Sequence, residues 1–102
     1  MPTEAQWLEL QLLRAKERRL DLKYRSARHM SEAMHQGLRA AQRRWRPQQR
    51  EVGHRRAILA MSNLYRMACI ERDEKQMIYQ EIRSLRRRKM FEFGVEADYY
   101  SD

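Results

Sequence analysis

The sequence predicts an all-α fold of two long amphipathic, coiled-coil-like helices broken near Pro47. Only 3 Gly and 2 Pro occur among 102 residues, well below average usage. Apolar residues in the first half recur every 3.5 residues, the spacing of a coiled-coil seam. Pro47 removes a backbone donor and disfavours helical geometry at the residue before it. The pattern leaves open whether the two helices form a hairpin or lie extended along a partner.

We expect the first helix over residues 3–45. Thr3 followed by Gln6 matches a capping box, which marks a helix start. Beyond it, a stripe advances by alternating steps of three and four residues, and nine of its eleven positions are apolar. These seam positions are Leu10, Leu13, Glu17, Leu20, Tyr24, Ala27, Ser31, Met34, Leu38, Ala41 and Trp45. The spacing predicts that this side of the helix packs against another helix.

The break is expected at residues 46–54, which contain Pro47 and Gly53, and the second helix over residues 55–91. Its best apolar seam comprises Ala57, Met61, Leu64, Ala68, Ile78, Ile82 and Leu85. Glu71 and Lys75 occupy the two positions in between, so we expect the helix to change its packing partner there. Gly94 is a stop signal. Residues 92–102 form an acidic tail, and the whole chain is one helical unit.

The charge is strongly basic and unevenly distributed. Lys and Arg total 22 against 14 Asp and Glu, for a net charge of +8. Residues 1–91 carry +12 and residues 92–102 carry −4. Most of the cations are Arg, whose planar fork of donors suits carboxylates and phosphates. The expected partner is therefore acidic: a protein surface, a nucleic acid or an anionic lipid.

Two basic clusters are the candidate partner-binding residues. The first surrounds the break and the second precedes the tail. They comprise Arg39, Arg43, Arg44, Trp45, Arg46, Arg50, Arg55 and Arg56, and then Arg83, Arg86, Arg87, Arg88 and Lys89. Arginines interleaved with an aromatic ring suit phosphate contacts and stacking, and equally suit salt bridges to carboxylates. The alternative interpretation is an ordinary solvated helix face, which is what charge runs commonly form.

Several classes of function are disfavoured. A single cysteine, Cys69, excludes a disulfide scaffold, and no apolar stretch approaches the ~20 residues of a membrane span. His29 and His35 are six residues apart, so they do not share a helix face as a metal-binding pair would. The three glycines are isolated, so there is no phosphate-binding loop. We expect no catalytic residues, no metal, no cofactor, no small-molecule substrate and no enzyme activity.

The N-terminal residues do not match a targeting signal, because Glu4 and Glu9 lie where a secretory or mitochondrial signal disfavours acids. The expected compartment is the cytoplasm, with the nucleus as an alternative. The run Arg86–Lys89 is similar to a nuclear localisation signal.

Two families share short motifs with this chain. Leu64-Tyr65-Arg66 resembles the motif of mitochondrial LYR proteins, but there it opens the first helix of a three-helix fold. Here it lies past the middle of the chain, so we attribute it to chance. The chain also resembles small ciliary microtubule inner proteins, which are short, basic and helical. The matching residues are Arg55, Arg56, Leu59, Leu64, Tyr79, Glu81, Ile82 and Leu85.

This second resemblance implies a non-enzymatic structural or adaptor protein that lies along the tubulin lattice of axonemal microtubules in the cilium. In that role, tubulin carboxylates pair with the arginines and a partner helix packs on the seam. Two other classes stay open. One is an RNA- or ribosome-associated protein that uses the same arginines on phosphates. The other is a coiled-coil subunit of a larger assembly, which depends on the seam instead.

Overall fold

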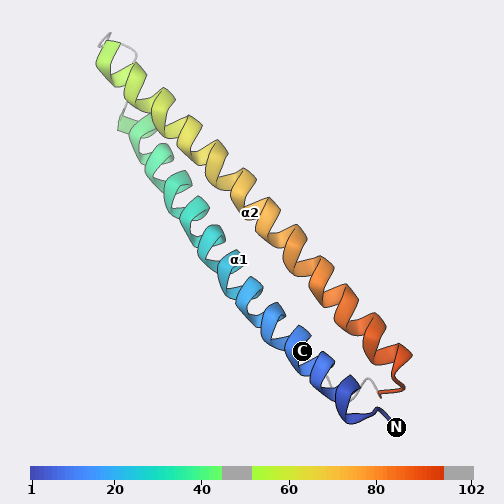
Figure 1. Ribbon diagram of the computed structural model, residues 1–102. Helices are drawn as coiled ribbons and strands as arrows, with labels where there is room; N and C mark the ends of the chain where they lie inside the picture. The colour runs from blue at the N-terminus through green and yellow to red at the C-terminus, as the bar shows by residue number, and fades with distance from the viewer. Residues whose placement is uncertain (45–51, 96–102) are drawn as a thin grey trace.

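The chain folds into a hairpin of two long antiparallel helices (Figure 1). A computed structural model describes residues 1–44 and 52–95. Helix α1 spans Glu4–Arg44 and helix α2 spans Val52–Glu92, each of 41 residues. The molecule measures 71 × 19 × 15 Å, and the described residues include no strand. The predicted all-α class is confirmed, and the structure adopts the hairpin rather than the extended arrangement.

Helix α1 begins at the predicted capping box. The Thr3 backbone N–H donates to Oε1 of Gln6 at 2.9 Å, and the Gln6 N–H donates to Oγ1 of Thr3 at 3.2 Å. These two bonds satisfy backbone donors that have no partner within the helix. The cap predicted from the sequence is therefore confirmed.

Helix α2 begins earlier than the sequence pattern suggests. Gly53 and His54, which we placed in the break, lie in its first turn. Gly53 does not adopt a positive φ, and a side chain added there would meet nothing within 4 Å. Gly53 therefore has a helical backbone with open space around it. A glycine in this position does not indicate a break between helices. Pro47 and residues 45–51 lie outside the described residues.

Helix α2 ends where the sequence predicts. Gly94 adopts a left-handed φ of 71°. The Val95 N–H donates to the carbonyl of Met90 at 2.9 Å, and the Gly94 N–H donates to that of Phe91 at 3.2 Å. This pair of bonds is a Schellman cap, which glycine favours because it has no Cβ to oppose the left-handed conformation. The stop signal at Gly94 is confirmed, and the tail from residue 96 onward lies outside the described residues.

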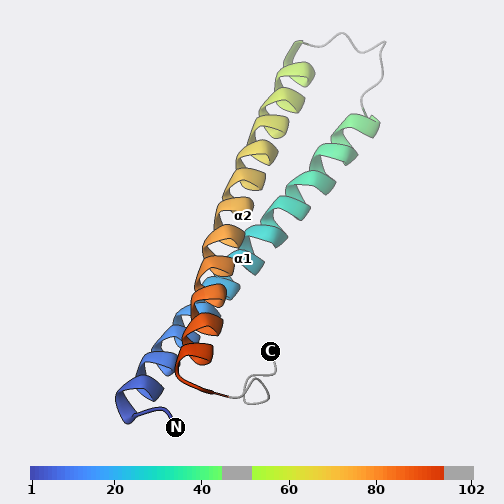
Figure 2. The ribbon, with the colours of Figure 1, turned by 90° about the vertical axis from the view of Figure 1, so that its right-hand side faces the viewer.

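The predicted seam of α1 faces α2. Every described member of that seam, from Leu10 to Ala41, is buried or half-buried. The stripe follows a heptad pattern whose a positions include Glu17, Tyr24 and Ser31. Leu10 and Ser31 are almost fully buried, at 0% and 1% exposure. The burial shows that the side of α1 selected by the periodicity packs on α2, which runs alongside it (Figure 2).

The seam of α2 differs from the prediction at alternate positions. Met61, Ala68 and Ile82 lie in it as expected, and Leu85 is half-buried. Ala57, Leu64 and Ile78 are exposed, and the residues that follow them take their places: Ile58, Tyr65 and Tyr79. The seam also passes through Arg72, Lys75 and Arg86, so it continues without a change of partner.

The polar residue Glu17 accounts for this rotation of α2. A carboxylate buried in a helix–helix seam requires a paired cation, because an unpaired buried charge is very costly. Arg86 supplies that cation and forms a buried ion pair with Glu17. Tyr24 and Tyr79 stack one heptad further along the hairpin, toward the loop, with ring centroids 6.5 Å apart. The apolar stripe that we predicted for α2 would have left Glu17 without this partner.

The two facing pairs define the register of the hairpin. Glu17 faces Arg86 and Tyr24 faces Tyr79, so residues whose numbers add to about 103 lie at the same level. We call residues 33–44 and 53–70 the loop half. Residues 4–20 and 83–92 form the terminal half, where the N-terminus and the end of α2 meet (Figure 1).

Candidate partner-binding surface

The second predicted basic cluster contains a residue that is not available to a partner. Arg86 is 1% exposed and donates from Nη2 to Oε1 of Glu17 at 3.2 Å, while its Nε donates to Oε2 of the same carboxylate. Its Nη1 also lies 3.3 Å from the Sδ of Met90. The prediction that Arg86 binds an external acidic surface is wrong, because the fork is already occupied by a carboxylate of α1.

Other members of this cluster also have partners within the hairpin. The Nζ atom of Lys89 lies 3.6 Å from Glu9 and 3.8 Å from Glu92. Arg83 is half-buried, and both Arg83 and Arg87 take part in side-chain interactions. Arg88 is exposed. The terminal half therefore uses Arg86 and Lys89 to hold its own two helices together.

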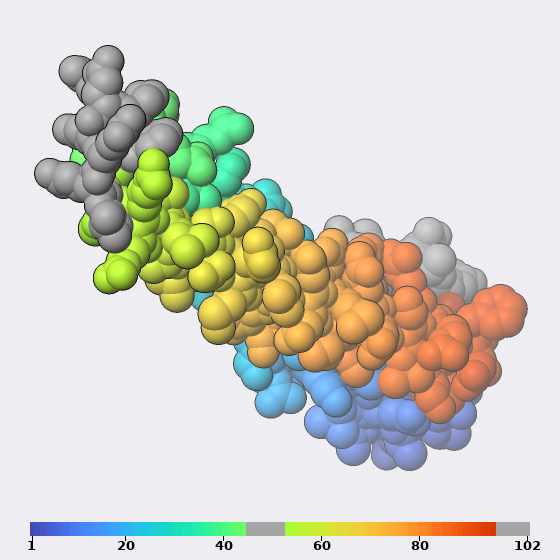
Figure 3. All heavy atoms as spheres, turned by 90° about the horizontal axis from the view of Figure 1, so that it is seen from above, coloured from blue at the N-terminus to red at the C-terminus, as the bar shows by residue number. Residues whose placement is uncertain are grey.

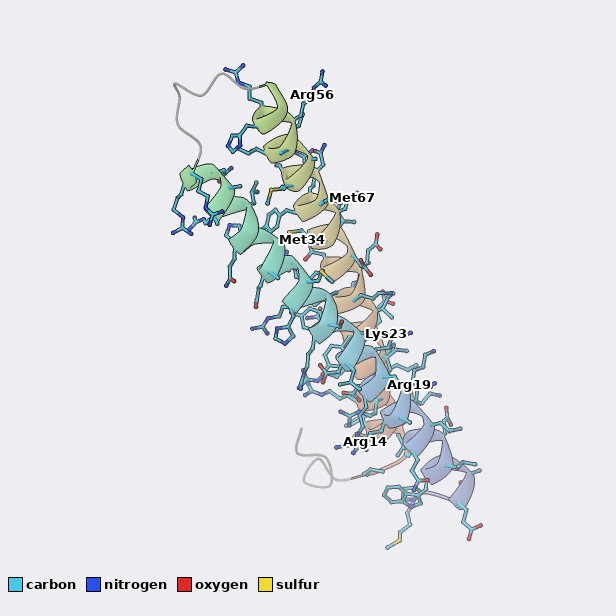
Figure 4. The ribbon with its side chains drawn as sticks, turned by 90° about the vertical axis from the view of Figure 1, so that its left-hand side faces the viewer. Arg14, Arg19, Lys23, Met34, Arg56 and Met67 are labelled. Atoms are coloured by element: carbon cyan, nitrogen blue, oxygen red, sulfur yellow. The ribbon has the colours of Figure 1, made fainter. Side chains whose placement is uncertain are left out.

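The first predicted cluster contrasts with this arrangement. Its described members lie toward the loop end of both helices, as the labelled Arg56 illustrates (Figure 4), and Arg66 of α2 lines a groove together with Arg39. We call these six residues the loop-end arginines: Arg39, Arg43, Arg44, Arg55, Arg56 and Arg66. All six are exposed, and none forms an ion pair with another residue that the structure describes. No Asp or Glu occurs in residues 33–44 or 52–70.

A groove between the helices joins the two sides of this cluster. It has a volume of about 520 Å³ and is lined by Arg39 of α1 and Arg66 of α2, among others. Its floor includes His35 and Tyr65, whose rings stack with centroids 5.0 Å apart. A side-chain hydrogen bond with Cys69 raises the pKa of Tyr65 above the usual value for a tyrosine. The groove thus combines two arginine side chains with an aromatic surface.

Arg66 is not among the partner-binding residues that the sequence predicts. It is an isolated arginine in an apolar stretch and belongs to no basic run, so nothing in the local pattern singled it out. The available signal was the long interval without acidic residues from Glu51 to Glu71. Three other predicted members, Trp45, Arg46 and Arg50, lie outside the described residues.

Features of other site classes are absent from the described residues. No group of three or more His, Cys, Asp or Glu side chains could hold a metal ion in residues 1–44 and 52–95. Neither α1 nor α2 carries, over the part described, an apolar stretch long enough to cross a membrane. Cys69, the single cysteine, is half-buried and forms no disulfide.

Searches against protein-family models, curated proteins and solved structures find no match to this chain.

Proposed function

We propose that this chain is a non-enzymatic structural or adaptor protein that packs along an acidic protein surface through the loop-end arginines. One observation carries this proposal: six exposed arginines, without ion-pair partners among the described residues, gather on the loop half, whose residues 33–44 and 53–70 include no Asp or Glu. Arginine forks bind carboxylates in a bidentate manner. A surface of one sign also accelerates association with a partner of the opposite sign.

The acidic surface that we favour is the tubulin lattice of axonemal microtubules, which would place the protein in the ciliary cytoskeleton. Two observations support this choice. The sequence resemblance to ciliary microtubule inner proteins includes Arg55 and Arg56, both of which are loop-end arginines. The 71 Å rod also offers an extended surface rather than an enclosed pocket, and this suits a partner that is itself extended.

Co-sedimentation with polymerised tubulin tests the proposal. We expect the wild-type chain to bind, and a variant with Arg39→Gln, Arg43→Gln, Arg55→Gln and Arg56→Gln to bind at least tenfold more weakly. The matched control is Arg87→Gln with Arg88→Gln in the terminal half, for which we expect a smaller loss.

Affinity purification of the native complex at moderate salt tests the partner class. Recovery of tubulin and axonemal proteins supports the proposal. Recovery of RNA or ribosomal proteins instead, with an affinity that falls steeply as salt rises, would overturn it in favour of a nucleic-acid-binding role in the cytoplasm or nucleus.

A further inference from the structure

A second groove lies on the other side of the hairpin from the groove that Arg39 and Arg66 line. Met30 and Met34 of α1 line it together with Leu64, Met67 and Ile70 of α2, and the labelled Met34 and Met67 lie in the loop-side part of the molecule (Figure 4). Four of these apolar side chains are more than half exposed, and Met67 reaches 66%. We call this surface the methionine groove. A contiguous apolar patch of this kind marks an interaction site more often than an isolated exposed residue does.

Charges of opposite sign continue this side of the two helices from the groove toward the terminal half. On α1, Lys16 and Lys23 precede Met30 by two heptads and one heptad, so they lie on the same side of the helix. On α2, Glu74 lines the groove, and Glu81 follows it by one heptad. With Arg19 and Glu71, these make three cations on α1 and three anions on α2. All six are exposed, and none forms an ion pair with another described residue.

Such a face can pair with a copy of itself where a cation of one helix meets an anion of the other at the same level. Arg88 ends the acidic row of α2 one heptad after Glu81, so the complementary level is that of Lys23 and Glu81. If a two-fold axis runs parallel to the hairpin, α1 of each copy lies over α2 of the other at the same level. The register then places Lys23 over Glu81 of the second copy, since their numbers add to 104. Each such contact occurs twice, because the interface is isologous.

Side-chain sizes fit the same arrangement. The register places the bulky Met67 and Leu64 of α2 over Gly37 and Ala40 of α1 in the second copy. Large residues over small ones allow two helix faces to interdigitate. A two-fold axis across the hairpin would instead oppose Leu64 and Met67 to the bulky residues of the other α2, and Gly37 and Ala40 to small residues.

We propose that a second copy of this chain covers the methionine groove, with α1 of each copy over α2 of the other, to form an antiparallel four-helix bundle. Such bundles bury apolar stripes that one hairpin leaves exposed. Dimerisation leaves Arg39 and Arg66 outside the interface, whereas Arg44, two heptads after Met30, lies on the covered side. It depends on different residues from the four whose substitution tests the proposed function.

Sedimentation analysis of the full chain measures the mass. We expect about 25 kDa, twice the chain mass of 12.5 kDa. Met67→Asp should give a monomer, because it introduces a charge into the centre of the apolar interface. Leu59→Asp is the matched control: Leu59 is 63% exposed, against 66% for Met67, but it lies one heptad before Arg66, on the arginine side. This variant should remain a dimer, and circular dichroism should show that both variants keep their helices.

A charge exchange tests the pairing. Lys23→Glu should weaken the dimer roughly tenfold, since it opposes two carboxylates at two symmetric places. Adding Glu81→Lys to the same chain should restore the wild-type dimer constant.

A cross-link tests the orientation. In a Cys69→Ser background, we mix a chain carrying Ala40→Cys with a chain carrying Leu64→Cys. The proposed axis predicts a disulfide between the two different chains. A wild-type monomer at 100 µM protein (about 1 mg/ml), a dimer insensitive to Met67→Asp, or cross-links only between identical chains would each overturn the proposal.

Discussion

The two halves of the hairpin differ in whether their cations are paired with carboxylates of the same chain. In the terminal half, Arg86 is 1% exposed and bound to Glu17, and Lys89 lies between Glu9 and Glu92. In the loop half, Arg39, Arg55 and their neighbours are exposed and unpaired among the described residues. Both halves are rich in arginine, but only the terminal half carries acidic residues, and the antiparallel register places Glu17 and Glu9 opposite its cations. A basic run therefore predicts a partner-binding surface only after the acidic residues across the hairpin have been assigned.

Breaking the buried ion pair should give the largest effect on stability. Glu17→Leu removes the carboxylate and leaves the guanidinium of Arg86 buried and unpaired, which costs about 3–5 kcal/mol. Urea denaturation measures this loss as a lower transition midpoint with an unchanged slope. The double variant Glu17→Leu with Arg86→Met should recover most of the stability, because it replaces the pair by apolar side chains of similar length. If the single variant unfolds at the wild-type midpoint, Arg86 does not hold the terminal half together.

This ion pair also marks the limit of prediction from the sequence. The periodicity of α1 identified its packing side, because its seam is apolar at most positions. In α2 two neighbouring stripes are both partly apolar, and the one containing Leu64 and Ile78 looked better by apolar content alone. Glu17 decides between the stripes, but only once the register of the two antiparallel helices is known. The same missing information made Arg86 look like a partner-binding residue.

Neutralising the loop half should affect binding and leave stability nearly unchanged. The variant with Arg39→Gln, Arg43→Gln, Arg55→Gln and Arg56→Gln removes exposed charges that have no described partner. Each surface substitution of this kind changes the free energy of unfolding by no more than about 0.5 kcal/mol. Its unfolding midpoint should remain close to the wild-type value while its affinity for an acidic surface falls. A loss of stability comparable to that of Glu17→Leu would show that these arginines support the fold instead.

Two glycine substitutions compare the ends of α2 directly. Gly94→Ala places a Cβ on a left-handed residue, which costs about 1 kcal/mol. Gly53→Ala lies in the first turn of the same helix with nothing within 4 Å of the new methyl group. It should increase stability by up to about 0.5–1 kcal/mol, because alanine loses less backbone entropy on folding. Opposite shifts of the thermal midpoint are expected, and shifts of the same sign would contradict the assigned backbone conformations.

The smallest expected effect concerns Tyr65 in the groove of the loop half. Its hydrogen bond with Cys69 raises its pKa, so it should ionise at a higher pH than an unperturbed tyrosine. Because the pKa of Tyr65 is higher in the folded state, this residue stabilises the fold at pH values below the usual tyrosine pKa near 10. The stabilisation is lost as the pH rises through the pKa of the folded state. The difference between the ultraviolet titration curves of the wild type and of Tyr65→Phe measures the ionisation of this tyrosine. Cys69→Ala should shift its ionisation back toward the usual range, since the largest cause of the higher pKa is then removed. If the difference spectrum titrates at the ordinary position in both backgrounds, Tyr65 and Cys69 do not interact and the groove is more open than its geometry indicates.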